Sequence, residues 1–542
     1  DRSDRLYLRY IYGGTSTDLY RIDVDGLRTV VATPSLLTLE TDSAGKIEIV
    51  IAEPHLVRIR GRGARLTLTL AESVSEASQW EEIFPYAVDE RPAWNAFIRR
   101  VKHHIALLAG SADLNAPWHP RGEGSHRHHR CSPFVLQFGG DELEIAIEDY
   151  ESEWEPREYS ASFDRCVEAV QADFDAWHQA APEVTEEYSR AAALASYVTW
   201  SAIVPASGNF RYPTMLMSKW WMNNAWNWDN YFNAWATTYR DPRFALRQFH
   251  LHLDHQHPQG ALGDGINEST VGLTYTKPPV HGWILGRMLA VHDYSDEVLK
   301  PIYEALCRWT EWWFRYRDSD GDGVCQYHHG NDSGWDDASA FDVTPPVESP
   351  DLTALLVIQM EVLSKLADRF EKSAEASDWM DRSERTLAAL IAHSWRGDRF
   401  VAMQSGTHAT VDDGGDSLLC QIPVILGRRL PDEQRRGLVS ALADEGRFLL
   451  PHGLATESAR SPHFIPEGYW RGPMWAPALM MVVDGLLDAG ETVLAKDIAR
   501  RFCDDCVTGG FAECYNARTG TPIHDPAYTW AASVFVILSQ LF

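Results

Sequence analysis

The first third of the chain alternates hydrophobic and polar residues with the period of a β-strand. Short runs rich in β-branched residues are separated by Gly, Pro, Asp or Ser, which favour turns. This alternation places hydrophobic side chains on one face of a sheet. We expect strands at 6–12, 28–31, 36–40, 46–51, 56–60, 65–70, 133–138 and 142–147. Strands this short and closely spaced predict an antiparallel β-sandwich over residues 1–150.

From about residue 185 onward, the hydrophobic period changes to that of an α-helix. The pattern predicts twelve helices, at 186–204, 227–240, 242–256, 278–293, 296–317, 351–371, 376–395, 416–426, 431–446, 473–488, 491–508 and 527–541. We therefore expect residues 185–542 to form a second, helical domain. Residues 151–184 are expected to be a helical linker between the two domains.

The connections between the expected helices alternate in length. A tight turn follows each even-numbered helix, whereas a long loop follows each odd-numbered one. Because successive antiparallel helices reverse the chain direction, all the long loops must lie at the same end. Six such hairpins predict an (α/α)6 toroid, an inner and an outer ring of helices. The long loops, at 205–226, 257–277, 318–350, 396–415, 447–472 and 509–526, would form one rim.

Length and composition narrow the class of protein. A chain of 542 residues is too long for one compact core, so two or three domains are expected. Hydrophobic residues make up 45%, but no apolar run is long enough for a membrane span. The net charge of -28 disfavours nucleic acid and anionic lipid as partners. The sequence indicates no organic cofactor, and it does not indicate an oligomeric state.

The cysteines and histidines give weaker indications. The eight cysteines are scattered rather than arranged as a disulfide framework. We therefore expect a cytoplasmic protein. Secretion with a removed leader is the alternative. The run from His126 to Arg130 contains three histidines that could bind a metal. Its glycine-flanked position favours an exposed loop instead.

Two carboxylates stand out because they occur in loops among aromatic and small residues. Asp336 ends the run Gly-Asn-Asp-Ser-Gly-Trp-Asp, and Glu513 begins Glu-Cys-Tyr-Asn-Ala-Arg-Thr-Gly. Their loops, after the fifth and eleventh expected helices, would share one rim. Cleaving a glycosidic bond requires an acid and a base of this kind, and Trp335 beside Asp336 would help to keep the acid protonated. The alternative is that Asp336 caps a helix and Glu513 is a solvated loop residue.

Five motifs in order resemble the glycoside hydrolase clan that contains family 63 and the family 37 trehalases. They span about residues 200 to 542, and the segment beginning at Glu513 is closer to the family 63 form, Glu-x-Tyr-Asn-Pro-x-Thr-Gly. The motifs are Trp228-Asp-Asn-Tyr-Phe232, Pro278-Pro-Val-His281, Asp332-Ser-Gly-Trp-Asp336, Tyr469-Trp-Arg-Gly-Pro473 with Trp475, and Glu513-Cys-Tyr-Asn516 with Thr519-Gly520.

The resemblance implies an inverting α-glycosidase with Asp336 as the general acid and Glu513 as the general base. The residues that would bind the sugar are Lys219, Trp228, Asp229, Trp335, Trp470, Arg471 and Trp475. Two departures weaken trehalose as the substrate. The run around Lys219 replaces an arginine-containing run of trehalases, and Asp332 replaces their usual glutamate. The tryptophans could alternatively be packing residues of the rim.

The run Asp318-Ser-Asp-Gly-Asp-Gly-Val324 resembles the front of a calcium-binding loop. Asp318, Asp320 and Asp322 hold the first, third and fifth positions, and glycine holds the sixth. The twelfth position is His329, so the usual bidentate glutamate is missing. Some family 63 members close a similar calcium site with a carboxylate from elsewhere, for which Glu348 is a candidate. A polar turn after the fifth helix is the alternative.

The sequence therefore predicts an exo-acting, inverting α-glucosidase acting on a short oligosaccharide or a glucosyl conjugate. Two alternatives remain within the same family: a hydrolase of mannosylglycerate or glucosylglycerate, and an enzyme resembling α-mannosidases. A toroid that binds sugar without catalysis is the alternative from another class. The linkage and the aglycone depend on loop conformations that the sequence does not define.

Overall fold

The computed structural model describes residues 5–71, 82–86, 91–98, 101–116, 118–119, 130–131, 134–343, 345–411 and 415–542. His126, His128 and His129 of the histidine-rich run lie outside these residues. The chain folds as two compact units, Asp1–Gln179 and Ala180–Phe542.

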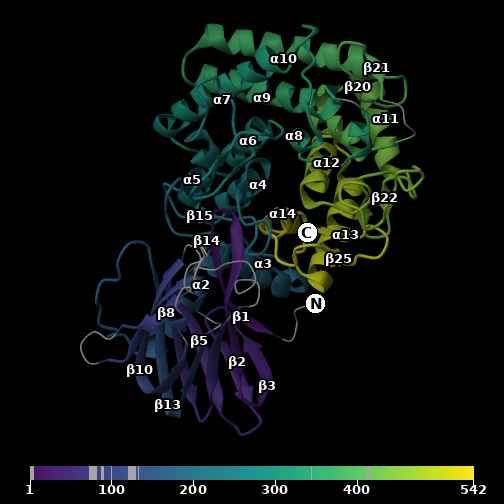
Figure 1. Ribbon diagram of the computed structural model, residues 1–542. Helices are drawn as coiled ribbons and strands as arrows, with labels where there is room; N and C mark the ends of the chain where they lie inside the picture. Colours follow the sequence, from purple (N-terminus) through teal and green to yellow (C-terminus); the bar gives the residue numbers. More distant parts are fainter. Residues whose placement is uncertain are drawn as a thin grey trace. The chain divides into compact units, whose positions relative to one another are not determined.

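An antiparallel sheet of eleven strands forms most of the first unit (Figure 1). Its main path runs β1-β2-β7-β13-β6-β5-β4-β3, and β10 joins β13 to β9, which pairs with β8. The strands are β1 (Leu6–Tyr12), β2 (Thr15–Val24), β3 (Leu27–Ala32), β4 (Leu37–Thr41), β5 (Lys46–Glu53), β6 (Leu56–Arg62), β7 (Leu66–Leu70), β8 (Glu82–Pro85), β9 (Ala93–Ile98), β10 (Val101–Asn115) and β13 (Val135–Tyr150). The expected antiparallel β unit is confirmed.

The last two expected strands are one long strand, β13. The sequence Gly139-Gly140 indicates a turn, but the chain continues through it as an irregularity in the pairing with β10. Gly140 has a φ of 130°, which a residue with a side chain rarely adopts. The two glycines therefore bend the strand instead of ending it.

Helix α2 (Phe163–Gln179) packs on the sheet of the first unit. Its buried residues Phe163 and Cys166 form a small cluster with Val50 of β5. This part of the expected linker therefore lies within the first compact unit.

The second unit contains the twelve expected helices, each within a few residues of its predicted ends. They are α3 (Ser189–Ser201), α4 (Asn227–Thr238), α5 (Pro242–Leu253), α6 (His281–Val291), α7 (Asp296–Tyr316), α9 (Pro350–Arg369), α10 (Ser373–Ser394), η3 (Leu418–Arg429), α11 (Asp432–Ala443), α12 (Ala476–Ala489), α13 (Thr492–Gly509) and α14 (Thr529–Leu538). The eighth, η3, is a 3-10 helix broken at Gly427. Within the described residues, none of the helices combines the length and apolarity that a membrane span needs.

Six of these helices close into an inner ring. Each contacts the next in the order α4, α6, α9, η3, α12 and α14, and α14 returns to α4. The other six pack outside it; α10 lies beside α9, for example, as Figure 1 shows. Nearly every residue of α4, α12 and α14 is buried, as a position between two layers requires. The predicted (α/α)6 toroid is confirmed.

Every inner helix follows one of the long loops. The antiparallel order therefore gathers these loops at the N-terminal ends of the inner helices. Asp229 lies in the first turn of α4, Trp475 precedes α12, and Tyr528 precedes α14. The loops that carry Asp336 and Glu513 lead into α9 and α14.

Close packing of α6 against α9 provides a test of the ring. A Cβ added to Gly282 would lie 2.5 Å from the backbone Cα of Gln359, whereas one added to Gly286 meets only a Val362 methyl group at 3.4 Å. We expect Gly282→Ala to destabilise the protein by about 1–3 kcal/mol, because the two helices must separate. Thermal unfolding would measure the effect.

Gly286→Ala is the matched control on the same helix. It should be neutral or stabilising by about 0.5–1 kcal/mol, because alanine favours helix. Equal stability of the two variants would contradict the close approach of α6 and α9.

Candidate functional site

A short helix holds the loop that carries Asp336. Helix α8 (Gly330–Ser333) ends where the Ser333 hydroxyl accepts a hydrogen bond from the Trp335 backbone N–H at 3.0 Å. Gly334 then adopts a φ of 75°, and a Cβ there would lie 2.6 Å from the indole of Trp228. Only glycine allows the loop to approach this tryptophan so closely.

Asp332 fixes the same loop from within. Its side chain is 2% exposed and pairs with Arg317 at 2.7 Å. It also accepts hydrogen bonds from the backbone N–H groups of Thr276 and His328, both at 3.0 Å. Asp332 therefore joins three segments of the rim.

Arg471 and Asp337 tie the Asp336 loop to the loop before α12. The Asp337 carboxylate accepts from the Trp470 backbone N–H at 2.7 Å, and the Arg471 guanidinium donates to the Asp337 carbonyl at 2.6 Å. Arg471 also pairs with Asp342. These contacts show Arg471 holding two loops together, and its assignment to sugar binding remains a prediction.

Glu513 is almost completely buried, with 1% of its surface exposed. The Tyr469 hydroxyl donates to its carboxylate at 3.0 Å, and the Asp525 backbone N–H approaches the other oxygen at 3.4 Å. Burial raises the pKa of Glu513 to about 8; the Tyr469 hydrogen bond opposes this change, and the charges of Asp525 and Asp229 add to it. At neutral pH, this carboxyl group can therefore exchange a proton.

Asp336 is half-buried, and burial raises its pKa as well. The charge of Asp337 acts in the same direction, whereas Lys277 and His329 oppose it. A raised pKa favours the protonated form from which a general acid donates.

Asp229 and Asp264 extend the group of carboxyls. Asp229 is buried and accepts a hydrogen bond from Tyr528 at 2.9 Å. Burial raises the pKa of Asp229 to about 7 and that of Asp264 to about 6, and Lys277 lowers both. Lys277 itself donates to the Asn331 carbonyl at 2.7 Å.

Tyr469 connects the two proposed catalytic residues. Its pKa is raised first by burial and then by the charges of Glu513 and Asp336, with a smaller contribution from Asp229. The three acids, which come from loops far apart in the sequence, thus share one environment. Glycosidic cleavage requires an acid and a base that act on one bond.

The predicted tryptophans form a packed cluster. Trp470 stacks on Trp475 with ring centroids 4.0 Å apart, and its centroid lies 4.8 Å from that of Trp335 and 5.7 Å from that of Trp228. All four are at most 2% exposed. They form an apolar wall beside the carboxyls, and their contact with sugar remains a prediction.

Lys219 contacts helix α3. Its ammonium donates to the Ser201 hydroxyl at 2.5 Å and lies 5.2 Å from the centroid of the Tyr197 ring. Burial lowers its pKa to about 8, although the charge of Asp525 opposes this. The backbone N–H of the same Asp525 approaches Glu513.

The sequence pattern assigns no role to Tyr469, Lys277, Tyr528, Asp264 or Asp525. Two of them had a usable signal, because Tyr469 begins the motif that contains Trp470 and Lys277 directly precedes Pro278. The others come near the site only through interactions between different loops and helices.

The three aspartates of the proposed calcium loop come together. One oxygen of each lies within 4.8 Å of the others. Asp318 accepts from the backbone N–H groups of Gly321 at 2.9 Å and Gly323 at 3.2 Å, which supports the sharp turn. His329, at the twelfth position, caps α8 instead. The donor set fits the front of a calcium site, and calcium remains a prediction.

Comparison with known proteins places this geometry in a family. Residues 222–531 match the "Mannosylglycerate hydrolase MGH1-like glycoside hydrolase domain". Mannosylglycerate hydrolase MGH1 of Selaginella moellendorffii is 24% identical over 49% of this chain and 66% of its own length. Glucosylglycerate hydrolase of Mycolicibacterium hassiacum is 22% identical over 50% of this chain and 76% of its own. The chain thus spans just under two thirds of the first relative.

A solved structure shares the toroid. The glycoside hydrolase family 63 mannosylglycerate hydrolase from Thermus thermophilus, in complex with glucose, has a TM-score of 0.55 at 20% identity, covering 64% of this chain and 98% of that one. Because the family match extends over more than half of the chain and includes both Asp336 and Glu513, the chain belongs to the MGH1-like glycoside hydrolases of family 63.

Proposed function

We propose that this protein hydrolyses the α-glycosidic bond of a glycosyl glycerate, mannosylglycerate or glucosylglycerate, with inversion at the anomeric carbon. Asp336 protonates the leaving oxygen, and Glu513 removes a proton from the attacking water. The observation that carries the proposal is the burial of both carboxyls beside Tyr469, with both pKa values raised. A raised pKa favours the protonated form that the acid needs, whereas Glu513, with a pKa of about 8, acts as the base in the fraction that is ionised.

The surroundings support the division of roles. Asp336 directly follows Trp335 in the chain, and burial favours its protonated form. Glu513 receives the Tyr469 hydrogen bond, which favours its ionised form. A water between the two carboxyls would attack the face of the sugar opposite the leaving group, and this requires a gap of about 6.5–9.5 Å.

The relatives favour a glycosyl glycerate over the broader prediction from the sequence, an α-glucosidase acting on a short oligosaccharide or a glucosyl conjugate. Those named above are a mannosylglycerate hydrolase and a glucosylglycerate hydrolase. The general α-glucosidase interpretation receives no comparable support from them. These relatives do not decide between mannose and glucose. Each is less than 25% identical to this chain over the aligned residues.

A substrate panel tests the proposal. Mannosylglycerate, glucosylglycerate, maltose and trehalose would be incubated with the protein, and proton NMR would record the sugar released in the first minutes. We expect one of the glycerates to be cleaved fastest and the β-anomer to appear first, because water attacks opposite the α-bond.

Early appearance of the α-anomer would indicate a covalent intermediate and would contradict Glu513 as a general base. Faster cleavage of maltose would favour the α-glucosidase alternative. If none of the four were cleaved, the proposed activity would be wrong and the sugar-binding alternative would gain support.

Removing either proton-transfer group should abolish most turnover. We expect Asp336→Asn and Glu513→Gln each to lower kcat by about 100-fold or more, because general acid or base catalysis contributes at least that much. Each change keeps the volume of the side chain, so the melting temperature and the binding of the free sugar should change little. A variant that kept more than about a tenth of the activity would exclude its residue from the assigned role.

Tyr469→Phe distinguishes the base from the acid. Loss of the hydrogen bond to ionised Glu513 should raise the pKa of that carboxyl further. A base must be ionised, so the rising, low-pH limb of the kcat/KM profile should move to higher pH. Movement of the falling limb instead would identify Glu513 as the acid.

Tyr303→Phe is the matched control. Tyr303 also donates to a carboxylate, that of Glu375 at 2.6 Å, but it lies between the outer helices α7 and α10. Its loss should leave the pH profile unchanged.

A further inference from the structure

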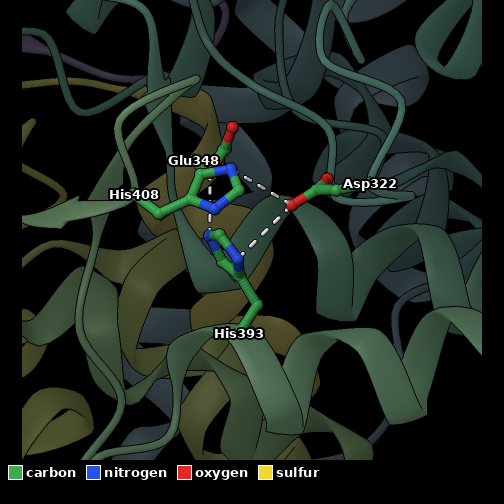
Figure 2. A group of neighbouring side chains, drawn as sticks. All are labelled: Asp322, Glu348, His393 and His408. Carbon is green, nitrogen blue, oxygen red and sulfur yellow. Dashed lines mark ion pairs between the residues drawn. The ribbon is translucent and has the colours of Figure 1, made fainter.

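Four potential metal ligands converge from separate elements of the second unit (Figure 2). Asp322 lies in the loop after α7, and Glu348 lies on the short strand β19 (Val347–Glu348). His393 is in the last turn of α10, and His408 lies between β20 (Met403–Gln404) and β21 (Ala409–Thr410). One ligand atom from each side chain lies within 4.8 Å of the others.

Glu348 is a buried carboxylate whose charge a bound cation would compensate. It is 0% exposed, and among the described residues neither of its carboxylate oxygens has a hydrogen-bond partner. Its nearer oxygen lies 2.7 Å from Nε2 of His393, but the two atoms are outside hydrogen-bonding geometry. A buried carboxylate without such a partner is costly. Imidazole nitrogen and carboxylate oxygen are both ligands that a divalent transition metal accepts, and an ion bound here would compensate the buried charge.

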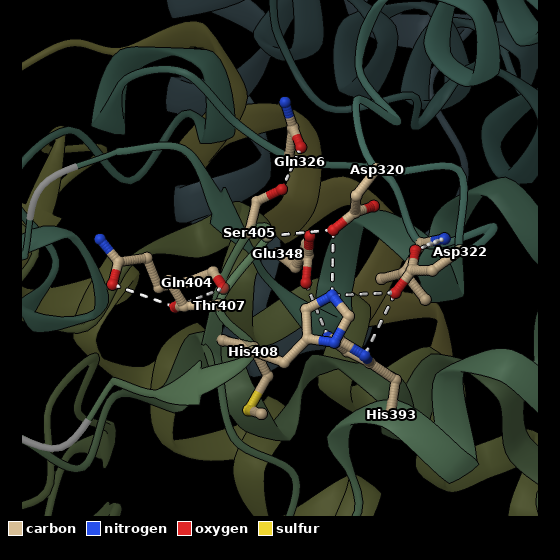
Figure 3. A network of polar contacts seen from close by, with 12 residues as sticks. Asp320, Asp322, Gln326, Glu348, His393, Gln404, Ser405, Thr407 and His408 are labelled. Atoms are coloured by element: carbon tan, nitrogen blue, oxygen red, sulfur yellow. Dashed lines mark hydrogen bonds and ion pairs between the residues drawn. The ribbon is translucent and has the colours of Figure 1, made fainter.

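The two histidines face carboxylates on several sides (Figure 3). Nδ1 of His393 lies 3.4 Å from Asp322, and Nε2 of His408 lies 2.9 Å from Asp320 and 3.6 Å from Asp322. The histidine rings are 4.9 Å apart between centroids and nearly perpendicular. In the described part of the chain, the ion-pair partners of Glu348 and Asp322 are these histidines alone.

We propose that Asp322, Glu348, His393 and His408 bind a divalent transition-metal ion with the ligand preference of Zn²⁺. Two imidazole nitrogens and two carboxylate oxygens form a common zinc donor set, whereas Ca²⁺ is bound by oxygen atoms. Two carboxylates would neutralise the charge of the ion. The site shares Asp322 with the predicted calcium loop, together with Glu348, the candidate for its closing carboxylate, but does not use Asp318.

The position of the site indicates a structural role. Asp322 and Glu348 lie on either side of the segment that carries Asp336, and a common ion would close that segment into a loop. His393 and His408 would join it to α10 and to the β20–β21 hairpin. The ion would restrain the loop and take no part in proton transfer, so binding can be tested independently of the proposed activity.

The test uses the full chain stripped of metal with a chelator and dialysed. Zn²⁺, Co²⁺ or Ca²⁺ is added, bound metal is counted by mass spectrometry, and the melting temperature is measured. An ion that binds only the folded state raises the melting temperature, here by at least about 2 °C for Zn²⁺. Co²⁺ should give the strong visible absorption of a tetrahedral site.

Variants locate the ion. His408→Ala, at a side chain that is 43% exposed, should fold normally, lose one equivalent of zinc and lose the rise in melting temperature. Glu348→Gln should do the same. His55→Ala removes another exposed histidine paired with a carboxylate, in the first unit, and should change neither measurement. Comparing equivalents between variants also accounts for zinc bound by the run at 126–130.

Asp318→Asn separates zinc from calcium. We expect it to leave zinc binding intact, because Asp318 is not among the four ligands. The proposal would be overturned if His408→Ala and Glu348→Gln kept the full zinc content and melting shift. Stabilisation by Ca²⁺ but not Zn²⁺, lost in Asp318→Asn and kept in His408→Ala, would also overturn it and would support the calcium loop.

Discussion

Buried hydrogen bonds between the first and last inner helices close the ring on which the site depends. The amide of Asn233 on α4 donates to Thr529 on α14 at 2.9 Å, and the hydroxyl of Ser533 donates back to Asn233 at 2.7 Å. All three side chains are fully buried, so these bonds have no competition from water. They join segments about 300 residues apart and thereby bring Asp229, at the start of the ring, beside Tyr528, at its end.

Closure of the ring brings acidic groups together in a buried site, where burial makes their ionised forms unfavourable. Asp229, Asp264, Asp336 and Glu513 all have raised pKa values, and burial is the largest cause for each. Lys277 moderates the first three, and Tyr469 moderates Glu513. Burial of these carboxyl groups lowers the stability of the protein. The same burial provides groups that can exchange protons near neutral pH. The packed tryptophans maintain this low-polarity environment, whether or not they touch the sugar.

The sequence predicts those features that repeat or that lie close together. Twelve amphipathic helices and the alternating loop lengths predict the toroid, and two motifs predict Asp336 and Glu513. Gly139-Gly140 misleads, because a glycine pair indicates a turn where the chain in fact continues as β13. The pattern also cannot show that Arg471 pairs with Asp342, or that His393 and His408 meet Glu348, since these contacts join different elements. Sequence spacing carries no signal for such contacts.

The loop that carries Asp336 is held from three directions, and none of these contacts uses the Asp336 carboxylate. Asp332 anchors it to Arg317 and Thr276, Asp337 anchors it to Trp470, and the proposed metal ion would hold both of its ends. A general acid must be placed accurately while its carboxyl stays available for the substrate. Dividing the two tasks meets both demands: neighbouring aspartates fix the backbone, and burial is the main influence on the proton affinity of Asp336. The fixed carboxylates of this loop thus supply restraints that the carboxylate proposed for catalysis does not have to supply.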